Sequence, residues 1–384
     1  MSETKPKKQR LLALDILRGI TIAGMILVNN PGSWGHIYPP LAHASWNGLT
    51  PTDLVFPFFM FIMGISTYFS LRGYNFELTA RTGWKILRRT VVIFFIGFAI
   101  VWFGRILRGA LSDGPIWDYM FDFSTIRILG VMPRLAICYG VGSLCALLIK
   151  GRKLWWFTGG LLVLYSILLI TGNGFEFADS NVISIIDHKV LGADHMYADT
   201  IDGVTLKFDP EGLLSTLPSI AHMLIGFICG GLIMSTRDNN LRINYLFIVG
   251  VILTFSGFLL DYGMPINKKI WSPSFVLTTC GLASSFLGFL IWVIDIRGHK
   301  RWCRFFEVFG INPLFLYCLG AVLSIVIGTV QIGGKSIKGI VYTDWLVPMC
   351  GDDTLASLVF AILFVLVNWL IGLILYNKKI YIKI

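Results

Sequence analysis

Charged residues are scarce in this chain. Only 14% of its 384 residues are charged, whereas 55% are hydrophobic and the mean hydropathy is +0.73. Soluble globular domains carry about 25% charged residues, so this balance excludes an ordinary soluble domain. The sequence also contains no P-loop, no dinucleotide-binding fingerprint and no paired CxxC spacing. No soluble cofactor-binding domain and no metal site are therefore predicted, and the seven cysteines are interpreted as small buried hydrophobes.

The chain has instead a series of long apolar runs, separated by short polar connections. Each run is continuous rather than alternating and approaches the roughly 20 residues that a helix needs to cross the hydrocarbon core. The predicted spans are 11–29, 52–71, 86–107, 126–149, 154–171, 213–235, 243–261, 274–295, 305–330 and 355–376. The sequence therefore predicts an all-α integral membrane protein, a single polytopic bundle of about ten transmembrane helices that forms one domain over residues 1–384.

The net charge of +10 follows this predicted topology. A basic chain can bind nucleic acid, so the distribution of its charges has to be considered first. About 21 Lys and Arg residues fall in the connections on one side of the predicted bundle, and about nine on the other. Such an excess marks the cytoplasmic side of membrane proteins. The asymmetry predicts that both termini are cytoplasmic and that the partner is the lipid bilayer, with no nucleic acid.

Three connections on the predicted outer side are long, at 30–51, 172–212 and 331–354. Loops of more than about 12–15 residues between packed helices are usually functional or disordered, and the first is rich in aromatic residues and proline. It contains His36 and His43 and leads to Asp53. The simplest explanation is two exposed histidines and an acidic residue at a helix start. A carboxylate within reach of an imidazole can also fix the tautomer of the ring and raise its basicity.

Further ionisable residues can each be interpreted in two ways. Asp15 and Arg18 share one face of the first span, as a structural ion pair or as a site in which Arg18 reaches an anionic ligand. Asp209 and Glu211 precede the span 213–235, either as partners of its helix dipole or as ligands of a cationic or hydroxyl-rich substrate. The outer segment PINKKIWSPSF carries either interfacial anchors or ligand-binding groups.

Several of these segments share a resemblance. The run LAHASWNGLTPTDLVFPFFMFIMG at 41–64, preceded by LDILRGITIAGMILVNNPG, resembles the catalytic portion of the heparan-alpha-glucosaminide N-acetyltransferase family and its bacterial members, the transmembrane glucosamine N-acetyltransferases. The likeness continues through IRILGVMPRLAICY at 126–139, DPEGLLSTLPSI at 209–220, INKKIWSPSF at 266–275 and GINPLFLY at 310–317. One departure is Pro133, where the family pattern has glutamine, and a proline inside the span 126–149 is expected to kink it.

The resemblance implies transfer of an acetyl group from cytoplasmic acetyl-CoA to the amino group of glucosamine or a glucosaminide on the periplasmic side, by a multi-pass protein of the bacterial inner membrane. By motif match, His43 corresponds to the active-site histidine, and Asn30, or less well Asn29, to an accompanying asparagine. The chemistry suits these residues, because an imidazole can take the proton of a sugar amine and an amide can donate to the thioester oxyanion. Asp53 would orient His43. A ping-pong route through an acetylated His43 is an alternative.

Two sets of binding residues follow as expectations. Arginines suit the phosphates of coenzyme A, although positive-inside anchoring also explains some of them. The expected coenzyme A ligands are Arg18, Arg88, Arg89, Arg127 and Arg134. The second set comprises the expected sugar-binding residues, which would stack on a sugar ring or form hydrogen bonds to its hydroxyls or amine. An aromatic belt at the membrane interface is the competing explanation for the tryptophans. This second set consists of Trp46, Asn47, Asp209, Glu211, Asn267, Lys268 and Trp271. The resemblance implies acetyl-CoA as a co-substrate, no metal is expected, and a homodimer is one option for the assembly.

Two different functions remain alternatives. A polytopic chain with Asp15 and Arg18 inside a span is also typical of an ion-coupled transporter of sugars or amino sugars. However, no internal repeat is visible, and the most distinctive polar cluster lies in one outer loop. The second alternative is an O-acyltransferase of envelope glycans, which would use the same histidine on a hydroxyl acceptor.

Overall fold

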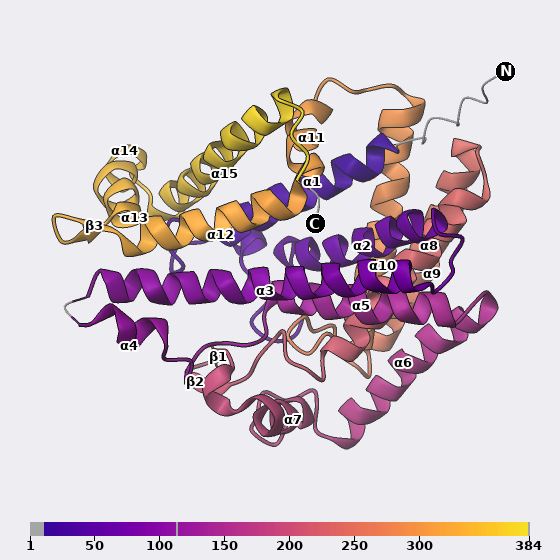
Figure 1. Cartoon of the computed structure of the whole chain (residues 1–384), viewed down its shortest axis with the longest axis horizontal. Coiled ribbons are helices and arrows are strands. Elements are labelled where there is room, and N and C mark those ends of the chain that lie inside the picture. The colour runs from indigo at the N-terminus through magenta and orange to yellow at the C-terminus, as the bar shows by residue number, and fades with distance from the viewer. Residues whose placement is uncertain (1–10, 113, 383–384) are drawn as a thin grey trace.

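The computed structural model describes residues 11–112 and 114–382 of the chain. Its architecture is a bundle of helices with two short hairpins (Figure 1). Within the described residues, eight helices are long and apolar enough to cross a membrane, or nine when one bent pair counts as a single span. The chain is therefore an all-α polytopic membrane protein, as its apolar runs predict.

The spanning helices follow the predicted runs closely. In chain order they are η2 with α2 (Pro51–Leu54 and Val55–Arg72), α3 (Ala80–Ala110), α5 (Val131–Leu148), α6 (Arg152–Thr171), α8 (Thr216–Ser235), α9 (Asn239–Asp261), α10 with the π-helical η4 (Pro273–Leu290 and Ile291–Ile296) and α15 (Asp353–Asn377). Of the two remaining predicted runs, 11–29 forms α1 (Leu12–Val28), whose 17 residues are at the short end of what crosses a bilayer.

The helices divide into an inner and an outer set. The apolar window of α8 is 72% buried, whereas those of α3 and α9 are only 17% buried. Inner helices approach closely, because a Cβ atom on Gly64 of α2 would lie 2.1 Å from the carbonyl oxygen of Met223 in α8. A Cβ atom on Gly226 would lie 2.2 Å from that of Phe61, so this crossing requires glycine in both helices. The mostly exposed apolar faces of α3 and α9 are suited to contact with lipid.

The span predicted over 305–330 is not one continuous helix. The structure breaks it into α11 (Cys303–Ile311) and α12 (Pro313–Thr329), which are bent by 86°. Asn312 lies between them with φ −121° and ψ 55°, because the residue before a proline avoids the helical region. Its side chain donates to the carbonyl of Ile380 and accepts from the backbone N–H of Ile382, so the same residue fixes the C-terminal segment.

The expected kink at Pro133 is also absent. The prediction assumed a helix over 126–149, but α5 begins only at Val131, and residues 121–130 form an irregular segment. Pro133 therefore lies in the first turn, where the backbone N–H of a residue has no partner inside the helix in any case. Arg134, the next residue, makes the ordinary bond from its N–H to the carbonyl of Gly130 at 3.0 Å.

The long connections carry the short elements. The first contains η1 (Pro39–Leu41), a shorter one contains α4 (Ile116–Met120), and the third long connection contains β3 (Gln331–Ile332), β4 (Lys335–Ser336), α13 (Ile337–Gly339), η5 (Ile340–Leu346) and α14 (Val347–Cys350). The segment 172–212, named the cap here, contains α7 (Val182–Leu191), η3 (Ala193–His195) and the antiparallel hairpin of β1 (Ala198–Ile201) and β2 (Val204–Lys207).

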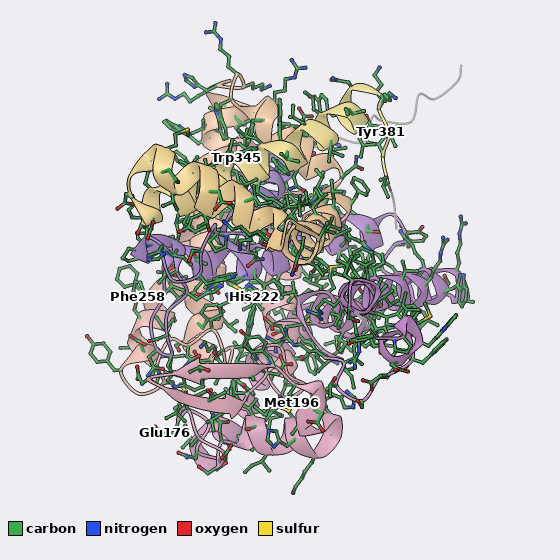
Figure 2. The ribbon with its side chains drawn as sticks, turned by 90° about the vertical axis from the view of Figure 1, so that its left-hand side faces the viewer. Glu176, Met196, His222, Phe258, Trp345 and Tyr381 are labelled. Atoms are coloured by element: carbon green, nitrogen blue, oxygen red, sulfur yellow. The ribbon has the colours of Figure 1, made fainter. Side chains whose placement is uncertain are left out.

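The cap lies at one edge of the molecule. Figure 1 shows α7, β1 and β2 in the lower part, below α3 and α5, with α12 above α3 and α15 above α12. Figure 2 shows Glu176 and Met196 in this lower part, Trp345 and Tyr381 in the upper part, and His222 between them. An apolar cluster that includes Tyr165 of α6 and Phe208 of the cap attaches the cap to the bundle. The cap is therefore packed on the bundle near the start of α8.

Candidate active site

The loop between α1 and η2 brings His43 against Asp53. The Nδ1 atom of His43 lies 2.6 Å from Oδ1 of Asp53, whose side chain is only 1% exposed, whereas the His43 side chain is 38% exposed. With the proton on Nδ1, the imidazole donates to the carboxylate and its Nε2 lone pair remains available. This is the geometry in which a carboxylate fixes the tautomer of a base.

The local sequence explains why Asp53 is held so firmly. Thr50 and Asp53 form a capping box around Pro51 at the start of η2. The Oδ2 atom of Asp53 accepts from the backbone N–H groups of Thr50 and Ala44, both at 3.1 Å. These donors stabilise the ionised carboxylate. Asp53 therefore makes both predicted contacts, since it caps the helix start and lies against the histidine.

A second segment reaches His43 from a distant part of the chain. Lys268, in the turn between α9 and α10, places Nζ 3.0 Å from Nδ1 of His43 and 3.5 Å from Oδ1 of Asp53. Burial lowers the pKa of Lys268, while the charges of Asp53 and Glu211 oppose that shift. The turn is anchored to the first loop, because the N–H of Gly48 donates to the carbonyl of Ile266 at 2.7 Å.

These groups open onto a cavity of about 110 Å³. Its polar lining comes from the end of α1, the first loop, the cap, the α9–α10 turn and α12. The polar residues are Asn29, His43, Thr52, Glu211, Lys268 and Tyr317, and the apolar ones are Met25, Val28, Val55, Phe56 and Val131. A cavity of this size holds several water molecules or a small polar group.

Behind the cavity, Arg127 binds two carboxylates. Its guanidinium contacts Asp209 through Nε at 2.9 Å and Nη2 at 2.5 Å, and Glu211 through Nη2 at 2.6 Å. The two carboxylates raise the pKa of Arg127 against the effect of its burial. Burial raises the pKa of Glu211, but Arg127 and Arg134 outweigh this effect and hold it below its ordinary value. Asp209 is fully buried and also accepts from the backbone of Tyr197 and Glu211, so its oxygens are occupied.

A further carboxylate lies beside this network without a charged hydrogen-bond partner. Asp187 of α7 is fully buried and accepts through Oδ1 from the N–H groups of Leu213 and Leu214, while Oδ2 has no hydrogen-bond partner. Burial raises its pKa to about 6, which these two backbone donors partly oppose. A Cβ atom on Gly212 would lie 1.7 Å from Oδ2, so only glycine fits there. The DPEG turn at 209–212 thus packs directly on α7.

The two candidate asparagines face different ways. Asn29 is exposed and lines the cavity, whereas Asn30 is buried and its amide donates to the carbonyl of Ile26 at 2.7 Å. The motif match favours Asn30, but the structure brings Asn29 and not Asn30 to His43. His36 lies elsewhere, 3.6 Å from the carboxylate of Asp353.

The predicted sugar-binding residues are only partly brought together. Glu211 and Lys268 line the cavity. Trp271 is 1% exposed and packs against Phe56 and His222, which leaves its ring no free face for a sugar. The other expected ligands serve contacts between segments: the indole of Trp46 donates to the carbonyl of Phe175, and the buried amide of Asn267 donates to Asn47. The structure gives no support to stacking on Trp271.

The five arginines expected to bind coenzyme A lie in two places. Arg127 belongs to the network behind the cavity, and Arg134 is fully buried, donates to the carbonyl of Gly212 and the hydroxyl of Ser215, and stacks over Trp271. Arg18 donates to Asp15 and to Ser66, which lies about 20 Å along α2 from Asp53. The predicted ion pair of Asp15 and Arg18 is therefore present.

The remaining two arginines are on the first half of α3. Arg89 stacks over the ring of Tyr139 at 4.6 Å, and its buried Nε has no hydrogen-bond partner. Lys85 of the same helix donates to Ser70 and Tyr74 at the far end of α2. Arg18, Arg88 and Arg89 therefore lie away from His43, toward the other end of the bundle. One site cannot contain all five arginines.

Sequence reasoning missed several residues of the site. Tyr317 reaches the cavity because α12 turns away from α11 at Asn312, and Val131 does so because α5 begins there. The signals that could have found them were Pro313 and Gly130, which mark helix starts. The described residues contain no group of three or more His, Cys, Asp or Glu side chains arranged for a metal ion.

The family model and the curated proteins that match the chain all point to one family. Residues 10–257 match the family model described as "Heparan-alpha-glucosaminide N-acetyltransferase, catalytic". Two curated proteins named heparan-alpha-glucosaminide N-acetyltransferase are similar to the chain. The human protein is 29% identical over 370 residues, covering 80% of this chain and 52% of its own length, and the mouse protein is 29% identical over 371 residues, covering 80% and 53%. The chain thus spans about half the length of the curated relatives it matches.

Proposed function

Because the chain belongs to the heparan-alpha-glucosaminide N-acetyltransferase family, we propose that it transfers the acetyl group of acetyl-CoA to the amino group of glucosamine or of a glucosaminide. The observation that carries the proposal is the pair of His43 and Asp53 at a cavity reached from the long outer loop. Both residues lie in the part of the chain that matches the family model. An acyl transfer needs such a base beside a space for the two reacting groups.

The proposed chemistry starts from the free Nε2 atom of His43. The amine of the acceptor gives one proton to Nε2, and its nitrogen bonds to the thioester carbon. The carbon–sulfur bond then breaks, and coenzyme A leaves as a thiolate that recovers the proton from His43. Asp53 holds the ring and stabilises the transient imidazolium. Asn29 lines the same cavity, so its amide is the side-chain donor that we assign to the thioester oxyanion.

A ping-pong order uses the same residues. His43 would then attack the thioester itself, and an acetyl-imidazole would pass the group to the amine in a second step. Incubation with labelled acetyl-CoA alone separates the two orders, because only the ping-pong order leaves label on His43.

We further propose that acetyl-CoA approaches from the cytoplasmic end and the amino sugar from the opposite side. Three observations support this sidedness. His43 lies in a long loop with few lysines and arginines, the shorter connections are basic, and Lys85 and Arg89 lie on the first half of α3, toward the other end of the bundle. Both termini are then cytoplasmic. Phosphates of the donor would bind near Arg88 and Arg89, with Arg18 deeper in the bundle.

The test is acetyl transfer by the purified protein in detergent. We expect N-acetylglucosamine and free coenzyme A from the wild type, and a rate lower by about 10²–10⁴-fold for His43→Ala. His36→Ala is the matched control, since it removes the other histidine of the same loop, and its rate should remain within about twofold of wild type. A well-folded wild type that makes no product, or a His43→Ala variant as active as His36→Ala, would contradict the proposal.

A further inference from the structure

Lys268 contacts the imidazole of His43 rather than pointing into open space. Its Nζ atom lies 3.0 Å from Nδ1 and 3.4 Å from Nε2 of the ring, and its side chain is 19% exposed. Nδ1 already faces the Asp53 carboxylate at 2.6 Å, so its proton is directed there. The contact between Lys268 and the ring is therefore mainly electrostatic. An ammonium group this close disfavours a second positive charge on the imidazole.

The other charges around His43 act in the opposite direction. Asp53 faces the ring from η2, and Glu211 faces the same cavity from the turn before α8, with Arg127 behind it. Tyr317 of α12 completes the titratable lining. Without Lys268, the histidine would face two carboxylates and the phenol of Tyr317, an environment that stabilises imidazolium. An imidazolium has no lone pair to accept a proton or attack a thioester.

The turn that carries Lys268 is built to hold it in place. The N–H of Trp271 donates to the carbonyl of Lys268 at 3.0 Å, and the N–H of Asn267 donates to the hydroxyl of Ser272 at 3.0 Å. Trp271 has φ +53°, a left-handed conformation that a bulky side chain rarely adopts. A strained residue persists only where its surroundings fix it, and here the Trp271 side chain is buried among Phe56, Phe275 and His222.

The neighbouring lysine has a different partner. Lys269 places Nζ 2.5 Å from the carboxylate of Asp199 in β1 of the cap. Two adjacent residues of equal charge thus serve different elements: Lys268 contacts the site, and Lys269 contacts the cap. Lys269 is a matched control for any experiment on Lys268, because its replacement also removes one positive charge from the same turn.

We propose that Lys268 is a positioning residue whose ammonium group keeps the His43 imidazole uncharged beside Asp53 and Glu211, so that Nε2 can accept the proton of the acceptor amine. The inference rests on the proposed function and deepens it, because it assigns Lys268 to the histidine and not to the sugar. Lys268 also lies outside residues 10–257, the range that matches the family model.

The test measures the charge state of His43 without requiring catalysis. Diethylpyrocarbonate acylates the neutral imidazole, and peptide mass spectrometry follows the reaction at His43 alone. The quantity compared is the ratio of the acylation rate at pH 6 to the rate at pH 8.5. A change in the accessibility of His43 to the reagent affects both rates equally and cancels in this ratio. We expect this ratio to fall about tenfold or more in Lys268→Met, because the histidine loses the ammonium group that disfavours its charged form. Lys268→Arg and Lys269→Met should stay within about twofold of wild type.

Acetyl transfer gives the second readout. In Lys268→Met, kcat should fall steeply at pH 6 and recover toward pH 8.5, with the KM for glucosamine changed by less than about threefold. An unchanged acylation ratio in Lys268→Met overturns the proposal. A KM for glucosamine that is raised equally at every pH also overturns it and assigns Lys268 to substrate binding. Lys268→Gln repeats the test if the methionine variant does not fold. A wild type without transfer, but with the expected acylation ratios, means that the proposed function fails while the pairing of Lys268 and His43 holds.

Discussion

At the end of the bundle that holds His43, cations lie against carboxylates, whereas at the other end, where Arg18 pairs with Asp15, several other cations contact neutral groups. Arg127 binds Asp209 and Glu211, and Lys268 lies beside Asp53. At the far end of α2 and α8, Lys85 contacts hydroxyls, Arg89 contacts a ring face and Arg242 contacts carbonyls and an amide oxygen. The first arrangement fixes a site, and the second leaves positive charge for an anionic ligand.

Replacing the carboxylate of the dyad should have the largest effect. In Asp53→Asn, the amide oxygen can still accept from Thr50 and Ala44, but its NH₂ group faces Nδ1 and favours the wrong tautomer of His43. We expect kcat to fall about 10³-fold with the fold retained, since a comparable tautomer error costs a serine protease about 10⁴-fold. The kinetics of the purified variant measure this. A loss that appears only in KM would contradict the orienting role.

Removing a cation that pairs with carboxylates at the end of the bundle that holds His43 should destabilise the protein. Arg127→Met leaves Asp209 buried without its counter-charge, and we expect a loss of about 3 kcal/mol, seen as a lower Tm in detergent. The control is Arg105→Met, because Asp122, the partner of Arg105, is exposed to solvent that screens the pair, so this variant should lower the Tm far less.

The same variant predicts a pH dependence. The pKa of Glu211 is held below its ordinary value of 4.5, so its contribution to stability is present above pH 4.5 and is lost as the pH falls through the lower folded value. The difference in Tm between wild type and Arg127→Met should therefore shrink in that acidic range. A difference that is constant from neutral pH down to about pH 3 would exclude a charge-based role for the network.

Removing Arg89, at the end of the bundle away from His43, should weaken the binding of acetyl-CoA and leave the stability of the protein unchanged. Arg89 lacks a hydrogen-bond partner for its buried Nε, so Arg89→Gln breaks no ion pair in the described structure. We expect the KM for acetyl-CoA to rise about tenfold, equivalent to one charge-assisted hydrogen bond, with the KM for glucosamine unchanged. Arg152→Gln, an exposed arginine at the start of α6, should change neither value. Equal effects of the two variants would leave positive-inside anchoring as the role of Arg89.

Asp187 lies near the same network but has no charged hydrogen-bond partner, and replacing it should have the smallest effect of these variants. Its folded pKa of about 6 lies above the ordinary 3.8, so the ionised side chain destabilises the fold fully above pH 6 and progressively less as the pH falls toward 4. Asp187→Asn keeps an acceptor for Leu213 and Leu214. We expect it to raise the Tm at pH 8 and to leave the Tm unchanged at pH 4. A Tm difference independent of pH would contradict this.

The sequence predicted much of the bundle because an apolar run of span length with few charges is seldom anything but a membrane-crossing helix. It also predicted the closeness of His43 and Asp53, which are ten residues apart in one loop. Asn29 and Asn30 could not be separated, because neighbouring residues at a helix end point about 100° apart and a shift of one residue exchanges them. The contacts of Lys268 with His43 and of Arg127 with Asp209 join positions 225 and 82 residues apart, and no local pattern encodes such pairings.

The break at Asn312 shows a different limit. Hydropathy alone is continuous across 305–330, so it predicts one span. The tripeptide Ile311-Asn312-Pro313 carried the signal for a boundary, because a residue before proline avoids the helical region. The angle of 86° could not be read from it, since packing of α11 on α1 and α15 and the bonds from Asn312 to residues 380 and 382 hold the two helices.

The most direct test of the account is transfer across a sealed membrane. Proteoliposomes are prepared with acetyl-CoA on one face and labelled glucosamine on the other, and orientation is determined with a protease site inserted at the exposed turn of Gly333 and Gly334. We expect N-acetylglucosamine only when glucosamine is on the face that exposes this turn and acetyl-CoA is on the opposite face, with none from His43→Ala. Product formed only when both compounds share one face would contradict it.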